Sequence, residues 1–287
     1  MWEMIWEVIL DALLDSAKML PFLFLAYLLI EYIERRHSEK IEKALAGGGE
    51  YGFFPGAVLG CVPQCGFSAM AANLYGSKVI TLGTLMAVFI ATSDEAIPVM
   101  LASPEHWKSL ALIIGLKVLV ALLAGFLLDF VLCRFLPHSV RGGYTGTTRE
   151  VDCHDHHEQD TLLMSAAKHT LNIFVFILLF NLAIGALIAL VGEENIAAFV
   201  QGWGVLEPAM AGVIGLIPNC AASVLLTQLY MSGALSFGGV VAGLCTGAGV
   251  GLAVLFKANR SVKQNAFIVA ALYVIGVAAG MIVSLFT

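Results

Sequence analysis

The sequence predicts an all-α polytopic membrane protein built from two inverted repeats, each with three transmembrane helices and a re-entrant or broken helical hairpin. Of its 287 residues, 59% are hydrophobic and 13% are charged, whereas soluble domains are about 45–50% apolar and about 25% charged. Apolar stretches of about 20 residues, enough to cross roughly 30 Å of hydrocarbon, follow one another with short connections. An unusual polar motif occurs twice within them.

Eight apolar segments are expected to be helical on length and apolarity, because a lipid-embedded helix is apolar on nearly all sides. They cover residues 10–34, 52–76, 79–102, 109–136, 161–191, 209–231, 235–256 and 265–286. The predicted organisation is a first repeat over 1–136 with a hairpin at 52–76, a polar His-containing cytoplasmic loop over 137–160, and a second repeat over 161–287 with a hairpin at 209–231.

The repeated motif places a Pro, a side-chain amide, a Cys and a Ser inside an apolar run. Residues Gly60, Pro63, Cys65, Ser68, Leu74, Tyr75, Gly83 and Ala87 recur at a constant spacing of 155 residues as Gly215, Pro218, Cys220, Ser223, Leu229, Tyr230, Gly238 and Ala242. Chance alignment of apolar sequence does not match Pro, Cys, Ser, Tyr and two Gly together. The two halves are therefore predicted to share one fold.

The orientation follows from Lys and Arg in short loops, which favour the cytoplasm. Three basic clusters are expected inside: Arg35, Arg36, Lys40 and Lys43; Arg134, Arg141 and Arg149; and Lys257, Arg260 and Lys263. The acidic N-terminus and the loop 192–207, with three Glu and no Lys or Arg, are expected outside. We predict the inner membrane, with both termini outside.

These assignments agree only if 52–76 and 209–231 enter the membrane and return on the same side. Two arms of about 11 residues, rising 1.5 Å per residue, reach about halfway across. Pro63 and Pro218 suit the first turn of the second arm. The first hairpin is then expected to open to the cytoplasm and the second to the outside. Three crossings per half invert the second half.

Inverted repeats with discontinuous helices are typical of secondary transporters, whose substrates bind at the repeat interface. The predicted substrate-binding residues at the two hairpin tips are Pro63, Gln64, Cys65, Gly66 and Ser68, with Pro218, Asn219, Cys220 and Ser223. A half-helix that begins at a tip directs free N–H groups and a positive dipole end to the centre, which favours an anion. The alternative is that Pro kinks a crossing helix and the polar groups satisfy the freed backbone.

A second polar group, Thr92-Ser93-Asp94-Glu95, lies inside the apolar segment 79–102. Carboxylates within a span indicate an ion pathway or proton relay, so Asp94 and Glu95 are candidate coupling-ion ligands. Thr92 and Ser93 are candidate substrate contacts. The second half keeps a Gly-rich break there, with Thr246 and Gly247 as further candidates. The alternative places the acids at the outer interface or in a pair with Lys117.

Lys117 is the remaining charge well inside a segment and is a candidate coupling residue. It is expected to neutralise the acids, attract an anion or extend to the interface. Asp129 lies nearer a segment end, where a solvated position is expected.

The Cys residues Cys61, Cys65, Cys220 and Cys245 are compatible with a soft metal or trivalent arsenic, or with small apolar packing. In the polar loop, His154, His156 and His157 are weak metal-ligand candidates. Their spacing forms no closed zinc motif, and a solvated linker is the alternative.

Residues 59–101 and 215–252 resemble the arsenic-efflux or heavy-metal (manganese) exporter permeases, relatives of the organoarsenical permeases. The resemblance rests on Gly60-Cys61-Val62-Pro63-Gln64-Cys65-Gly66, Leu74-Tyr75-Gly76 and Ala91-Thr92-Ser93-Asp94-Glu95-Ala96. With the segment pattern it covers most of the chain. It implies an ion-exporting permease and leaves the ion open.

The expected function is secondary-active export of a small inorganic anion or metalloid, of the phosphate, arsenate or arsenite kind, coupled to H⁺ or Na⁺. The neutral character of the repeated tips favours the anion. A divalent, manganese-type heavy-metal cation is the alternative, favoured by Asp94 and Glu95. An intramembrane Cys enzyme is a remote alternative, because a nucleophilic Cys needs a nearby base and all seven His lie in loops or near segment ends.

No organic cofactor is expected. The expected partners are the lipid bilayer and the inorganic ion, with a homodimer as an option. Nucleic acid is not expected, because the net charge is −6 and nucleic-acid binding calls for a basic patch.

Overall fold

The computed structural model describes residues 51–61, 65–92, 96–101, 103–134, 138–142 and 204–286, with single positions between 10 and 28 and between 163 and 182. Within these ranges the elements are helices, and one isolated β-bridge joins Thr81 to Gly142. Three of the described helical stretches are long and apolar enough to span a membrane: Pro104–Val131, Phe237–Ala258 and Val262–Ser284.

The described residues 51–134 contain five α-helices, and a short sixth one lies at the start of the polar loop. They are α3 (Phe53–Gly60), α4 (Cys65–Gly76), α5 (Leu82–Ala91), α6 (Ala96–Leu101), α7 (Trp107–Phe126) and α8 (His138–Arg141). A 3-10 turn, Pro104–His106, precedes α7, and a π-helical turn, Leu127–Val131, with a 3-10 turn, Leu132–Arg134, continues it.

The second half repeats this series. From residue 204 onward it contains a 3-10 turn, Gly204–Leu206, followed by α11 (Glu207–Gly215), α12 (Cys220–Met231), α13 (Phe237–Thr246), α14 (Gly251–Ala258) and α15 (Val262–Ser284). Four of these helices begin 155 residues after their first-half counterparts: α12 after α4, α13 after α5, α14 after α6 and α15 after α7. The spacing found in the motif residues therefore extends to the helix starts.

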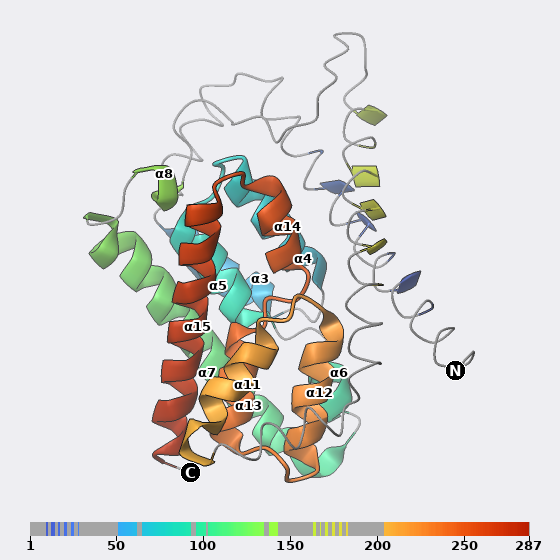
Figure 1. Cartoon of the computed structure of the whole chain (residues 1–287), viewed down its shortest axis with the longest axis vertical. Helices are drawn as coiled ribbons and strands as arrows, with labels where there is room; N and C mark the ends of the chain where they lie inside the picture. The colour runs from blue at the N-terminus through green and yellow to red at the C-terminus, as the bar shows by residue number, and fades with distance from the viewer. Residues whose placement is uncertain are drawn as a thin grey trace.

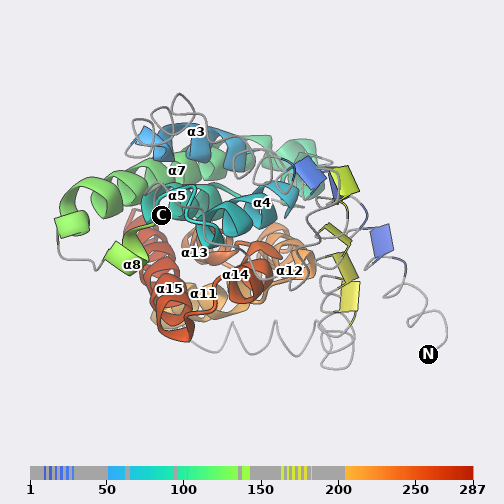
Figure 2. The same cartoon turned by 90° about the horizontal axis from the view of Figure 1, so that it is seen from above.

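The packing also follows this correspondence. Figure 2 shows the helices of the first half on one side of the molecule and those of the second half on the other. Across the boundary, α4 packs on α14 and α12 packs on α6, while α5 meets α13. All ten residues of α5 are buried, as are nine of the ten in α13. These two helices form the centre of the protein.

Contacts at the helix ends show that the chain reverses between α11 and α12. The Ser236 backbone N–H, after α12, donates to the carboxylate of Glu207 at the first position of α11, at 2.5 Å. Figure 1 accordingly shows α11 and α12 together in the lower half of the molecule. In the first half, a Cβ on Gly56 of α3 would lie 3.2 Å from the Thr84 carbonyl oxygen, so α3 begins near the start of α5, where α4 has just ended.

The two central helices are each followed, after a short interruption, by another helix. After α5 the chain leaves the helical conformation at Thr92, where ψ is 124°. After α13, Gly247 is extended and Gly249 has a φ of +52°, a conformation that favours glycine. The Gly-rich break that the sequence predicts in the second half is therefore present, between Thr246 and Gly251.

Candidate functional site

The C-terminal ends of α5 and α13 meet at the centre of the protein. An α-helix leaves its last four carbonyl groups without intrahelical partners, and its C-terminus carries a partial negative charge. In α13 two side chains use these carbonyls: the Thr246 hydroxyl donates to the Gly243 oxygen at 2.9 Å, and Lys117 donates to the Leu244 oxygen at 2.7 Å.

Lys117 links the two halves at this point. It lies on α7 and its side chain is fully buried. Its ammonium donates to the backbone carbonyl of Thr92, the residue that ends α5, and to that of Leu244 in α13. Of the three roles expected for Lys117, extension to the membrane interface is wrong, because the group is buried at the meeting point of two helix ends.

The N-terminus of α12 lies at the same centre. Asn219 is its N-cap residue, and the side-chain oxygen accepts a hydrogen bond from the Ala221 N–H at 2.9 Å. Side-chain oxygens of Asn are among the preferred N-cap groups because they satisfy N–H groups that have no helical partner. Asn219 is 8% exposed. The amide that the sequence places at the second tip therefore orders the start of this half-helix.

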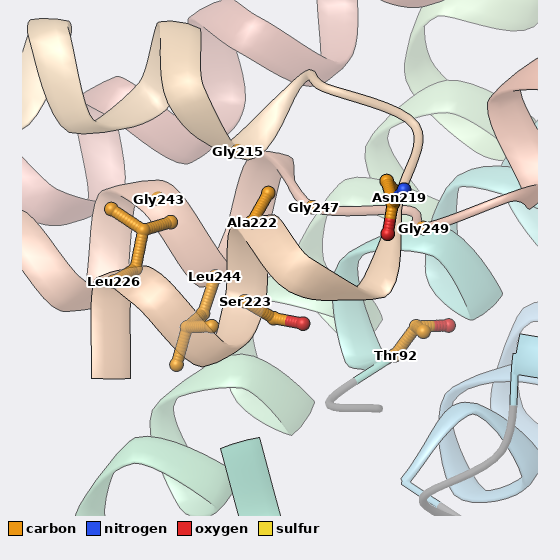
Figure 3. Close-up of a pocket in the computed structure, with 10 residues that line it drawn as sticks. All are labelled: Thr92, Gly215, Asn219, Ala222, Ser223, Leu226, Gly243, Leu244, Gly247 and Gly249. Carbon is orange, nitrogen blue, oxygen red and sulfur yellow. The ribbon is translucent and has the colours of Figure 1, made fainter. Parts of the chain in front are cut away.

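A small cavity lies between these helix ends, with a volume of about 10 Å³, roughly the space of one water molecule. Its lining residues are Thr92, Gly215, Asn219, Ala222, Ser223, Leu226, Gly243, Leu244, Gly247 and Gly249. Figure 3 shows the polar side chains of Asn219, Thr92 and Ser223 toward one side of the view and the apolar side chain of Leu226 toward the other.

The chemistry of this lining is neutral. It offers hydroxyls from Thr92 and Ser223, the Asn219 amide and backbone groups of glycines, with no Asp, Glu, Cys or His among the described lining residues. Lys117 brings a full charge to this wall, because Thr92 and Leu244 both line the cavity and both accept its hydrogen bonds. Such a space suits a small species that is held by hydrogen bonds.

The predicted site residues divide into three groups. Four line the cavity: Thr92, Asn219, Ser223 and Gly247. Others lie nearby without lining it: Gly66 is buried in α4, Ser68 is fully buried against α14, Pro218 is half-buried, and Thr246 donates to the Gly212 and Gly243 carbonyls. A third set lies outside the described residues or side chains: Pro63, Gln64, Cys65, Ser93, Asp94, Glu95, His154, His156, His157 and Cys220.

The sequence also offers Cys and His residues as candidate metal ligands. Within the described ranges, no group of three or more His, Cys, Asp or Glu side chains lies close enough to hold a metal ion. Cys61 is half-buried and its thiol donates to the Ala57 carbonyl at 3.2 Å, while Cys245 is buried in α13. Both are free thiols in the structure.

Asp129 departs from the expected solvated position, because its side chain is 3% exposed. One carboxylate oxygen accepts from the Thr81 hydroxyl at 2.7 Å and the other from the Gly83 N–H at 2.9 Å. Thr81 is the N-cap residue of α5. The carboxylate therefore interacts favourably with the positive end of the α5 helix dipole. This interaction and the two hydrogen bonds offset the cost of burying the charge.

Several residues of the cavity were not expected from the sequence. Gly215, Gly243 and Gly249 line it, and the Leu244 carbonyl binds Lys117. Backbone carbonyls carry no signal in a sequence. Two signals in the sequence do point to glycines of this region: the Gly-rich stretch around 247 marks a helix break, and Gly215 belongs to the repeated motif.

The described helices and the buried polar centre define the class of protein: a multi-pass helical membrane protein with interrupted helices that meet in its interior. The family model described as "Putative, 10TM heavy-metal exporter" matches residues 1–190 and 131–236. The chain belongs to this family of membrane transporters, as the resemblance in the sequence predicts. No curated protein and no solved structure matches the chain.

Proposed function

We propose that the protein is a secondary-active exporter that moves a small inorganic oxyanion or metalloid hydroxide, of the arsenate, arsenite or phosphate kind, by alternating access coupled to H⁺ or Na⁺. The observation that carries this proposal is the neutral cavity at the meeting point of helix ends, with the Lys117 ammonium bonded to its wall. Hydroxyl and amide groups bind the oxygen atoms of such a species. The Lys117 charge favours an anion over a cation.

The inverted-repeat architecture supports alternating access. Corresponding helices in the two halves begin at the same spacing, and the crosswise contacts of α4 with α14 and of α12 with α6 are those expected of two halves related by a pseudo-two-fold axis. In Figure 1 the helices α11 and α12 lie in the lower half and α4 and α14 in the upper half.

The distribution of charge supports the proposed orientation. At one end, Tyr75 donates to the Val140 carbonyl, Thr81 bridges to Gly142, and Gly76 packs on Ala258. The basic residues at or next to these contacts are Lys78, Arg141, Lys257 and Arg260. The opposite end carries Glu207, bonded to Ser236. Basic loops favour the cytoplasm, so we assign the first end to the inside of the inner membrane.

A divalent heavy-metal cation is the second candidate. The family description names heavy metals, and Asp94 and Glu95 follow Thr92 directly in the sequence. Carboxylates are preferred ligands of hard divalent ions such as Mn²⁺. In this alternative the two acids bind the metal, and Lys117 balances their charge when the site is empty.

Uptake by everted membrane vesicles tests the two candidates, with arsenate, arsenite, phosphate, manganese and zinc compared in parallel. We expect uptake of an oxygen-bearing anion or metalloid, and its apparent affinity should fall about 2- to 10-fold in Ser223→Ala, the effect of one neutral hydrogen bond. Ser232→Ala is the matched control, because Ser232 follows α12 and donates to the Leu229 carbonyl away from the cavity. Uptake of manganese or zinc alone refutes the anion proposal.

A further inference from the structure

Lys117 suggests how this protein holds positive charge at its centre. Its ammonium is bonded to two backbone carbonyls, one at the end of α5 and one in the last turn of α13. In transporters with broken helices, the C-terminal ends of half-helices and the carbonyls of unwound backbone are the groups that coordinate a coupling Na⁺. Lys117 therefore occupies the position at which a free monovalent cation would bind.

We propose that the Lys117 ammonium is a tethered cation that fills a built-in monovalent-cation site formed by the carbonyls of Thr92 and Leu244. The inference rests on the proposed function in assigning this site to a transport cycle. Its physical basis is separate: two partial negative charges of helix ends converge, and the Thr92 and Leu244 carbonyls lie in a fully buried environment.

The buried carbonyls of Thr92 and Leu244 need a positively charged partner. A carbonyl that loses its partner in a buried place costs about as much as a missing hydrogen bond, and two helix C-termini repel each other. The hydroxyl of Thr246, two residues after Leu244, already donates to the carbonyls of Gly212 and Gly243. A chain without the Lys117 charge therefore binds Na⁺ or K⁺ at these carbonyls, whereas the natural chain needs neither.

The counterpart of Lys117 in the second half is Leu272, 155 residues later on α15, and its side chain is fully buried and apolar. The second half therefore supplies no ammonium of its own at the equivalent place. One lysine serves the helix ends of both halves, so a single substitution removes the tethered charge.

The test compares the melting temperature of purified full-length protein in sodium chloride, potassium chloride and N-methylglucamine chloride at equal ionic strength. In Lys117→Gln, which keeps N–H donors but loses the charge, we expect sodium or potassium to raise Tm by about 5 °C over N-methylglucamine when the salt is about 100-fold above its dissociation constant. The salt that acts identifies the preferred ion. The natural chain and Lys117→Arg should show no such dependence.

Lys108→Gln is the matched control, because it makes the same substitution at an exposed position on α7. Equal Tm of Lys117→Gln in all three salts overturns the inference. So does a Lys117→Gln protein that folds in none of them, since free sodium or potassium would then fail to replace the ammonium. A dependence shared by Lys108→Gln overturns it as well, because the effect would be general.

Transport by the natural chain gives an independent measurement. The proposed function fails separately, if the natural chain moves none of the oxyanions or metalloids. Tm of Lys117→Gln needs no substrate, so the two failures are distinguishable.

Discussion

Removal of the Asp129 carboxylate should destabilise the protein more than its location near the end of a span suggests. Its two oxygens accept from the Thr81 hydroxyl at 2.7 Å and from the Gly83 N–H at 2.9 Å, in a place with 3% exposure. Asp129→Ala leaves both donors without this acceptor. Asp129→Asn keeps one oxygen for Gly83 but presents an amide group to Thr81.

The magnitude follows from these contacts. A hydrogen bond to a charged group contributes about 1.5–3 kcal/mol, and a buried donor left unsatisfied costs about 1–3 kcal/mol. Relief of the desolvation cost of the carboxylate offsets part of this loss. We expect about 3 kcal/mol for Asp129→Ala and about half as much for Asp129→Asn, which corresponds to a fall in Tm of roughly 2–4 °C per kcal/mol.

The assay is thermal unfolding of the purified protein in detergent. Unfolding is monitored by circular dichroism or by the fluorescence of a dye that does not react with thiols. Glu207→Gln is the matched control, since the Glu207 carboxylate accepts from Ser236 N–H near the start of α13 in a more exposed setting. Its Tm should fall by less than that of Asp129→Asn. If all three variants melt within about 1 °C of the natural chain, Asp129 does not stabilise the start of α5.

Three further outcomes follow from the structure and the sequence. Gly215→Ala should lower Tm and slow transport, because a Cβ at this site would lie 2.9 Å from the Gly243 carbonyl carbon and overpacking costs about 1–3 kcal/mol; an unchanged Tm contradicts the close approach. Tyr75→Phe should cost about 0.5–1.5 kcal/mol and speed hydrogen exchange in α8, since its hydroxyl donates to the Val140 carbonyl at 2.5 Å; exchange at the natural rate rejects this tie. Asp94→Asn should change the pH or sodium dependence of flux, and an identical dependence removes Asp94 from the coupling role.

The arrangement of helices was largely predictable, because it depends on patterns that repeat in the chain. The 155-residue spacing of Gly60 and Gly215 predicted equivalent halves, and the helix starts of the structure keep this spacing. The Gly-rich stretch predicted the break after α13. Both signals arise from local backbone requirements, which a sequence records directly.

The contacts of the charged residues were not predictable to the same degree. Asp129 was expected in solvent because it lies near a span end, yet it binds the start of α5, 46 residues away in sequence at Gly83. Lys117 was expected to act on side-chain charges or an anion, and the structure adds backbone carbonyls as its partners. The backbone partner of a charged side chain cannot be predicted from the sequence, because it depends on which helix end the fold places beside that side chain.

The single lysine at the centre also bears on the energetics of a transport cycle. If two inverted halves had identical sequences, a two-fold rotation would convert the inward-facing state of the empty protein into the outward-facing state. The two states would then have equal free energy. Lys117 is fixed to α7 of the first half and has Leu272 as its counterpart, so the exchange of roles between halves no longer restores the same contacts. Under the proposed alternating-access cycle, the resting equilibrium between the two states would therefore be biased by the sequence itself, before any ion gradient acts.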